Sequence, residues 1–272
     1  MESEMQAKFN FLSFLIILTI IVSGVSSCKN KKAGNTNVSE TSQSSNPIVD
    51  VEPYDAAYLL SQGLSAVNEI ETEGIPEYSY NKGLNFFYQV VTKFPETNEA
   101  VEAQFNIAKY TEKKIKLLNM REIDIRKRQS PGKTLDFDEL KPFLQSYIPA
   151  INEYIKLYNN KKIWENFRGD FLKKSRRLCS DSLLQAAQLL ADETNPKPDY
   201  NRAIEIYRII IDEFSDSNYG DFSIYSIVSI YYNMKNWSKT IEYAKLMESN
   251  FPQSQYLLEV DSKAKKSRSL LK

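Results

Sequence analysis

The sequence predicts an all-α protein built from repeated pairs of antiparallel helices. Composition gives two reasons: glycine and proline are scarce, at 8 and 10 of 272 residues, while tyrosine and phenylalanine are frequent, at 17 and 14. This balance favours long helices packed through aromatic side chains over a turn-rich β protein. The third reason is a repeat, because YNKGLNFFYQVVTKFP at 80–95 aligns without a gap with YNRAIEIYRIIIDEFS at 200–215.

Each repeated segment has the spacing of one buried helix face. In the first copy, Gly83 is followed by Phe87 after four residues, by Val90 after seven and then by Pro95. Positions i, i+4 and i+7 share a helix face, the small residue admits a neighbouring helix, and proline ends the helix. Other copies are Ala203, Tyr207, Ile210 and Ser215; Thr240, Ala244, Met247 and Pro252; and, more weakly, Ala150, Tyr154, Leu157 and Lys162. In the three stronger copies, a Ser or Thr two residues beyond the stop is an N-cap candidate for the next helix.

In chain order, the pattern predicts ten helices. They are expected at 54–71, 77–94, 98–126, 138–158, 162–177, 179–193, 198–213, 217–233, 237–249 and 254–270. Pro142 falls in a first turn, where proline is tolerated, whereas Pro149 is expected to kink its helix. The segment QSPGKT at 129–134 is the clearest break, and the spacing of the copies leaves room for a degenerate hairpin at Thr111–Arg128. The basic segment 263–272 is expected to close the stack.

These spacings resemble the tetratricopeptide repeat, a pair of antiparallel helices of about 34 residues. The resemblance covers residues 53–272 and implies a right-handed solenoid of four to five repeats. One helix pair cannot bury its apolar stripe alone, so stacked copies must cover each other. The concave face of such a solenoid usually binds peptides or partner proteins, and the resemblance implies that role here.

The N-terminus is typical of an exported lipoprotein. Lys8 precedes the apolar run FLSFLIILTIIV, which is short for a membrane span and suits a signal-peptide core. The stretch from Val25 to Cys28 resembles a bacterial lipobox, with an aliphatic residue, two small residues and the cysteine that would carry the lipid. We therefore expect a signal peptide at 1–27 and lipidation of Cys28. The alternative is an uncleaved anchor helix over residues 9–27.

Two details of the N-terminal region bear on this prediction. Glu2 and Glu4 make the first residues acidic where a basic segment is expected, which favours Met5 as the start of translation. Residues 28–52 are rich in Ser, Asn and Thr and contain few large apolar side chains, so they are expected to form a flexible tether.

The sequence argues against catalysis. It contains no histidine, which excludes histidine-based triads and histidine metal sites. It has no glycine-rich phosphate loop, no GxSxG elbow and no cysteine spacing for a metal, so we expect no enzyme activity, no metal and no cofactor. Cys179 aligns with Leu59 at the repeat offset of 120, and we expect it to be a core residue rather than a reactive thiol.

Aromatic residues and basic runs mark candidate binding surfaces. The aromatic residues Tyr147, Tyr154, Tyr158, Trp164 and Phe167 fall in the least repeat-like region. Tyr147, Tyr158, Trp164 and Phe167 are candidate anchors for a partner, and the alternative is ordinary core packing. Seven Lys or Arg residues lie in each of the segments 113–128 and 161–177. These segments could face anionic head groups or an acidic partner, or could simply be solvated helix faces. Nucleic acid is not an expected partner, since the 35 basic and 35 acidic residues balance.

The lipobox, the tether and helix junctions such as FPETNEAVEAQF and FPQSQYLLEV are together similar to two groups of bacterial envelope proteins. One is the BamD lipoproteins of the machine that inserts β-barrel proteins into the outer membrane, and the other is the Tol–Pal-associated tetratricopeptide proteins. The resemblance implies a scaffold anchored in the outer membrane and facing the periplasm. Ser215 and Lys162 depart from it at junction positions that should hold proline. The alternative function is an accessory solute- or glycan-binding lipoprotein of a nutrient-uptake system.

Overall fold

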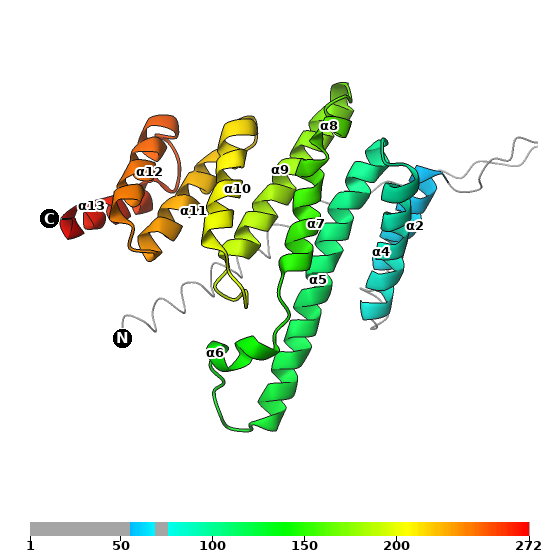
Figure 1. Ribbon diagram of the computed structural model, residues 1–272, viewed down its shortest axis with the longest axis horizontal. Helices are drawn as coiled ribbons and strands as arrows, with labels where there is room; N and C mark the ends of the chain where they lie inside the picture. Colours follow the sequence, from blue (N-terminus) through cyan, green and yellow to red (C-terminus); the bar gives the residue numbers. More distant parts are fainter. Residues whose placement is uncertain (1–54, 69–75, 272) are drawn as a thin grey trace, which may run out of the picture. The chain divides into compact units, whose positions relative to one another are not determined.

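The computed structural model describes residues 55–68 and 76–271, and its regular secondary structure there is entirely helical (Figure 1). This confirms the predicted all-α class. The described residues belong to one compact unit, Val51–Lys272. The predicted signal peptide, the lipidation site Cys28 and the tether over 28–52 lie outside the described residues.

The helices follow the predicted order closely in both repeat-rich ends of the chain. The elements are α2 (Ala56–Asn68), α4 (Pro76–Lys93), α5 (Asn98–Gln129), α6 (Phe137–Leu140), the 3-10 helix η1 (Lys141–Phe143), α7 (Ile148–Asn159), α8 (Lys161–Trp164), α9 (Gly169–Ala191), α10 (Tyr200–Glu213), α11 (Gly220–Asn233), α12 (Trp237–Asn250) and α13 (Leu257–Leu270). The long helices pack in sequence: α2 on α4, α4 on α5, α5 on α7, α7 on α9, and so on to α13.

Some helices also contact the second long helix along the chain, in addition to the next one. Helix α2 also touches α5, α5 touches α9, and α11 touches α13, whereas α9 and α11 make only minimal direct contact. Each helix therefore has neighbours both within its own pair and in the next pair. This is how stacked pairs cover the apolar stripe that one pair would leave exposed.

Helix α5 joins two clusters of buried side chains. Its residues Ala103 and Ile107 belong to the cluster formed with α2 and α4. Val101 and Ala108, on another side of the same helix, belong to the larger cluster that continues through α7 and α9 to α13. A helix buried along two sides needs apolar residues at more positions than a single stripe supplies.

The turns that follow α4, α10 and α12 share one backbone hydrogen bond. The amides of Thr97, Ser217 and Ser254 donate to the carbonyl oxygens of Phe94, Phe214 and Phe251, at 3.2, 2.8 and 3.0 Å. In each turn, an aromatic residue at the end of one helix comes three residues before the Ser or Thr that was predicted from the repeat as an N-cap candidate. The Thr97 hydroxyl caps α5 by accepting from the amide of Ala100.

The prediction of one kinked helix over 138–158 is wrong. The segment divides into α6, η1 and α7, and Pro149 lies in the first turn of α7, where its missing N–H leaves no bond unmade. The linker before α7 is held by Asn119 of α5, whose amide donates to the carbonyl of Gln145 at 3.0 Å. The amide N–H of Gln145 donates back to Asn119 Oδ1 at 2.7 Å. This reciprocal pair satisfies the backbone N–H and C=O of Gln145 within the break.

Two further boundaries differ from the prediction. The helices expected at 162–177 and 179–193 are instead the short α8 and the continuous α9, which runs through position 178. The degenerate hairpin expected at Thr111–Arg128 is absent, since α5 continues unbroken through it. Residues 111–128 and 170–191 contain no Gly or Pro that would end a helix, whereas Gly169, with φ of 59°, stands where α9 begins.

Candidate functional site

The repeat-signature residues are structural. The small positions Gly83, Ala150, Ala203 and Thr240 are all buried, as are Phe87, Tyr154, Tyr207 and Ala244. Pro95 and Pro252 are exposed in the turns. At Gly83, an added Cβ would lie 2.3 Å from Val67 Cγ1 and 3.1 Å from the carbonyl oxygen of Gly63. The small residue at this position therefore lets α2 and α4 approach closely, as the spacing predicted.

Trp164 is part of the core and is not available to a partner. Its side chain is 1% exposed, and its indole N–H donates to the Leu157 carbonyl at 3.0 Å. Tyr154 is buried as well, and its hydroxyl donates to Glu112 Oε2 at 2.7 Å. Burial raises the pKa of Glu112 above its ordinary value of 4.5, against the effect of this hydrogen bond and of nearby lysines. These two aromatic positions thus match the core alternative.

The remaining aromatic candidates are half-buried and pack against the larger cluster: Tyr147, Tyr158 and Phe167. The Tyr158 hydroxyl donates to Glu213 Oε1 at 2.5 Å, and Lys161 Nζ lies 2.7 Å from Glu213 Oε2. These two hydrogen bonds lower the pKa of the Glu213 carboxyl. They tie the end of α7 and the start of α8 to the end of α10. The Tyr158 ring also meets Phe214, with ring centres 6.5 Å apart.

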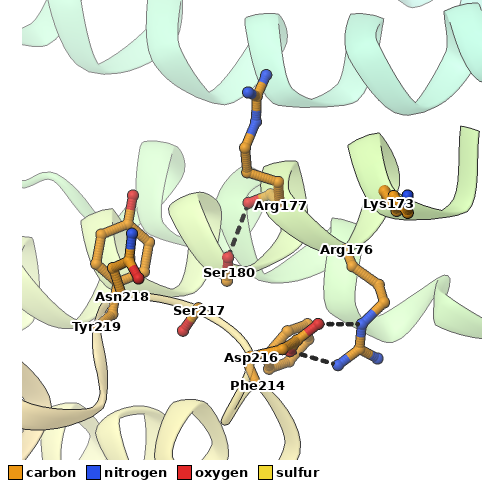
Figure 2. Close-up of a pocket in the computed structure, with 9 residues that line it drawn as sticks. All are labelled: Lys173, Arg176, Arg177, Ser180, Phe214, Asp216, Ser217, Asn218 and Tyr219. Atoms are coloured by element: carbon orange, nitrogen blue, oxygen red, sulfur yellow. Dashed lines mark hydrogen bonds and ion pairs between the residues drawn. The ribbon is translucent and has the colours of Figure 1, made fainter. Parts of the chain in front are cut away.

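Phe214 also lines a pocket. The pocket has a volume of about 340 Å³ and lies between α9 and the turn from α10 to α11 (Figure 2). Lys173, Arg176 and Arg177 of α9 form one wall, while Phe214, Asp216, Ser217 and Tyr219 of the turn form the other. The lining residues come from α9 and from this turn, which ends where α11 begins at Gly220.

Arg176 holds the two walls together. Its Nη2 lies 2.8 Å from Asp216 Oδ1 and its Nε donates to Asp216 Oδ2 at 3.2 Å, a two-pronged pair visible in Figure 2. The same Nη2 donates to the Glu213 carbonyl at 3.0 Å, and the guanidinium lies 5.2 Å from the centre of the Phe214 ring. The hydrogen bonds from Arg176 lower the pKa of the Asp216 carboxyl. These contacts occupy Arg176 and position the turn.

The other two cations on α9 are not neutralised in this way. Lys173 Nζ is 3.8 Å from Asp170, and the two side chains are 82% and 100% exposed. Such an exposed pair contributes little. Arg177 has no ion-pair partner among the described residues, and in Figure 2 its side chain points away from the Arg176–Asp216 pair. With three cations and one carboxylate in its lining, the pocket is net positive.

Hydroxyl groups complete the lining. The Tyr219 hydroxyl donates to Asp181 Oδ1 at 2.6 Å, and burial together with this bond raises the pKa of Tyr219 to about 12. It therefore adds no negative charge near neutral pH. The hydroxyl of Ser217 is buried and has no hydrogen-bond partner among the described residues. In the two equivalent turns, the hydroxyl of Thr97 donates to the Phe94 carbonyl, and that of Ser254 donates to a carboxylate.

A cluster of aromatic rings lies one helical turn beyond the pocket. Phe222 follows Tyr219 by one turn of α11. The rings of Tyr225 and Tyr256 stack with centres 4.7 Å apart, and Phe222 meets Tyr256 edge-on at 5.7 Å. Lys263 Nζ lies 5.1 Å from the centre of the Tyr225 ring. The three rings, which we call the aromatic shelf, are half-buried, so part of each remains open to solvent.

The basic segment 113–128 behaves differently from the pocket wall. Arg121 pairs with Glu77 at 3.2 Å and Arg126 with Glu122 at 2.7 Å. Lys127 and Arg128 are exposed near the end of α5, and neither lines the pocket. These contacts match the alternative of a solvated helix face.

Other sites weighed from the sequence can be placed as well. Cys179 is 0% exposed, and burial raises the pKa of its thiol well above the usual range, which agrees with a core role. Over residues 55–68 and 76–271, no three Cys, Asp or Glu side chains are grouped so as to hold a metal ion. Within the same residues, no helix is both long and apolar enough to cross a membrane.

Comparison with known proteins supplies no identification. No protein-family model matches the chain, and a search of curated proteins finds no significant relative. The sites above therefore depend on the residues and geometry of this chain alone.

Sequence reasoning found one wall of the pocket and missed the other. Lys173, Arg176 and Arg177 belong to the basic segment 161–177 that the composition singled out. In the sequence, the residues of the opposite wall mark only a helix junction: Phe214, Asp216 and Ser217. The one available signal was Ser215, which replaces the expected junction proline two residues before Ser217.

Proposed function

We propose that this chain is a lipid-anchored tetratricopeptide-repeat scaffold that holds partner proteins in the bacterial envelope. The observation that carries the repeat assignment is the equivalence of four helices: α4, α7, α10 and α12 each bury a small residue at the same signature position. The matching turns after α4, α10 and α12 give independent support. Stacks of such pairs have a large surface relative to their core, which suits protein binding.

The binding role is supported by the surface between α9, α11 and α13. There the chain combines a net-positive pocket with half-buried aromatic rings. Aromatic and arginine side chains are the residue types most often found at the centres of protein interfaces. The narrower proposal, a subunit that assists β-barrel assembly and faces the periplasm from the outer membrane, rests on the sequence resemblance alone.

A crosslinked pull-down tests the function. Tagged wild-type protein and the Cys28→Ala variant are expressed at equal levels, and captured proteins are identified by mass spectrometry from membranes. We expect an outer-membrane β-barrel assembly protein to co-purify with the wild type and to be lost from the capture with the Cys28→Ala variant, which should itself leave the membrane fraction. Recovery of a sugar or peptide importer as the sole companion would replace the scaffold with the nutrient-uptake alternative. Recovery of no specific protein would refute the scaffold.

A further inference from the structure

We propose that the pocket between α9 and the α10–α11 turn receives an acidic side chain of the partner, with an adjacent aromatic residue of the partner on the aromatic shelf. This inference rests on the proposed function, since it names the chemistry of the segment that the scaffold would hold. It commits to a protein segment in which Asp or Glu stands beside Tyr, Phe or Trp.

Charge is the first support. The lining holds Lys173, Arg176 and Arg177 against the single carboxylate of Asp216. Asp181 is outside the lining, and its carboxylate accepts a hydrogen bond from the Tyr219 hydroxyl. Because Arg176 already binds Asp216 with two nitrogens, the positive charge left over belongs to Lys173 and Arg177. A carboxylate entering between them would gain charge-assisted hydrogen bonds that the described residues do not supply.

The walls are held in place before any ligand arrives. The Arg176–Asp216 pair, the Arg176 contact to the Glu213 carbonyl and the packing of Phe214 together position the turn against α9. Glu213 is in turn held by Lys161 of α8 and Tyr158 of α7. A site whose walls are fixed loses less conformational entropy on binding, which favours affinity.

The shape of the site favours a protein segment over a bilayer or a free anion. A lipid surface presents a broad plane, whereas this pocket is a recess of about 340 Å³ between α9 and the α10–α11 turn. The neighbouring half-buried rings of Phe222 and Tyr225 would contribute nothing to the binding of a small inorganic anion. A peptide can instead place one carboxylate in the recess and lay the next side chain across the rings.

Peptide titration against the full-length protein in detergent tests the inference. The probe is a fluorescein-labelled, C-terminally amidated peptide of alternating Glu and Tyr, and fluorescence anisotropy reports binding. We expect the Glu–Tyr peptide to bind, and Gln–Tyr and Glu–Ser peptides to bind more weakly. The double variant Lys173→Gln/Arg177→Gln should weaken binding by about tenfold or more, because two charge-assisted contacts are lost.

The matched control is Lys127→Gln/Arg128→Gln, which makes the same charge change on exposed residues of α5. It should leave the affinity unchanged. Equal losses in both double variants would mean diffuse charge attraction and would overturn the site. The site is also overturned if inorganic phosphate or phosphatidylglycerol vesicles bind in a pocket-dependent way while the peptide does not.

The same variants separate this inference from the proposed function. If the partner in the pull-down is recovered equally with wild type and with Lys173→Gln/Arg177→Gln, the scaffold stands and the pocket is not its acidic-segment site. If the purified protein binds the Glu–Tyr peptide through the pocket but no partner is captured from membranes, the pocket chemistry stands and the scaffold role fails.

Discussion

Replacing Gly83 with alanine tests whether close approach of α2 and α4 is what the small signature residue provides. The new Cβ would lie 2.3 Å from Val67 Cγ1, whereas an ordinary carbon–carbon contact is about 3.5–4.0 Å. The helices must therefore shift locally by more than about 1 Å. Val67 cannot easily rotate away, because it is 3% exposed and its branched side chain has few allowed rotamers in a helix. The carbonyl oxygen of Gly63, 3.1 Å from the same Cβ, blocks a simple slide.

The expected loss of unfolding free energy can be bounded. Overpacking of a buried site costs about 1–3 kcal/mol, and the upper part of that range applies because a backbone atom is involved. Alanine recovers up to about 1 kcal/mol through its better helix propensity. We therefore expect Gly83→Ala to lower the unfolding free energy by about 1–2 kcal/mol. Asn85→Ala, on the exposed side of the same helix, is the control and should be neutral or stabilising.

A double-mutant cycle with Val67→Ala isolates the contact. Val67→Ala alone removes buried methyl groups and should cost about 1–3 kcal/mol. The same change makes room for a Cβ at Gly83, so the double variant should be more stable than the sum of the two losses by about 1 kcal/mol or more. Urea unfolding followed by circular dichroism at 222 nm measures all four proteins. Additive losses, or a Gly83→Ala protein as stable as wild type, would refute the close-approach explanation.

Three further predictions address buried groups. Trp164→Phe removes a buried indole and its hydrogen bond, so thermal unfolding should show a loss of about 1–3 kcal/mol, and an unchanged melting temperature would contradict core burial. For Glu112, the pKa in the folded state is raised above its ordinary value of 4.5. The contribution of this carboxyl to the unfolding free energy is therefore fully present below about pH 4.5 and is lost as pH rises through the folded-state pKa. The unfolding free energy of Glu112→Gln, relative to that of the wild type, should therefore increase from acidic to neutral pH. Tyr154→Phe keeps the Glu112 carboxyl, so its unfolding free energy should still fall with pH as that of the wild type does. A difference between Glu112→Gln and wild type that stays constant with pH would count against burial of the carboxyl. In a Cys28→Ser chain, Cys179 should react with a thiol reagent about 100-fold or more slowly when native than when denatured, and equal rates would show that the thiol is accessible.

Local patterns in the sequence predicted much of the fold. The spacing that begins at Gly83 and recurs at Ala203 and Thr240 is a property of single helices, so it correctly marked the buried faces of α4, α10 and α12. The aromatic residue and the Ser or Thr that follow each of these helices marked the turns for the same reason. Such signals involve residues only a few positions apart, and their geometry is set by the backbone itself.

Elsewhere, local signals competed with packing. Pro149 was compatible with a kink or with a first turn, and the contacts of Asn119 with Gln145, 26 residues away, accompany the break before it. The sequence around position 178 was compatible with two helices or one, and the structure forms one continuous helix there, α9. A periodic pattern gives a helix its face but gives only weak information on where it ends.

The sequence by itself determined that this chain forms helices with repeating buried faces, and that it carries a lipobox-like segment and two basic runs. The tertiary structure decided which of those basic residues act together. Lys173, Arg176 and Arg177 became one wall of a pocket because the α10–α11 turn, about 40 residues further along, packs against α9 and brings Asp216 and Ser217 opposite them. The sequence gives the charge of each residue. Which charged residues become neighbours depends on which helices pack against each other, and this packing is determined by the buried faces of all the helices together.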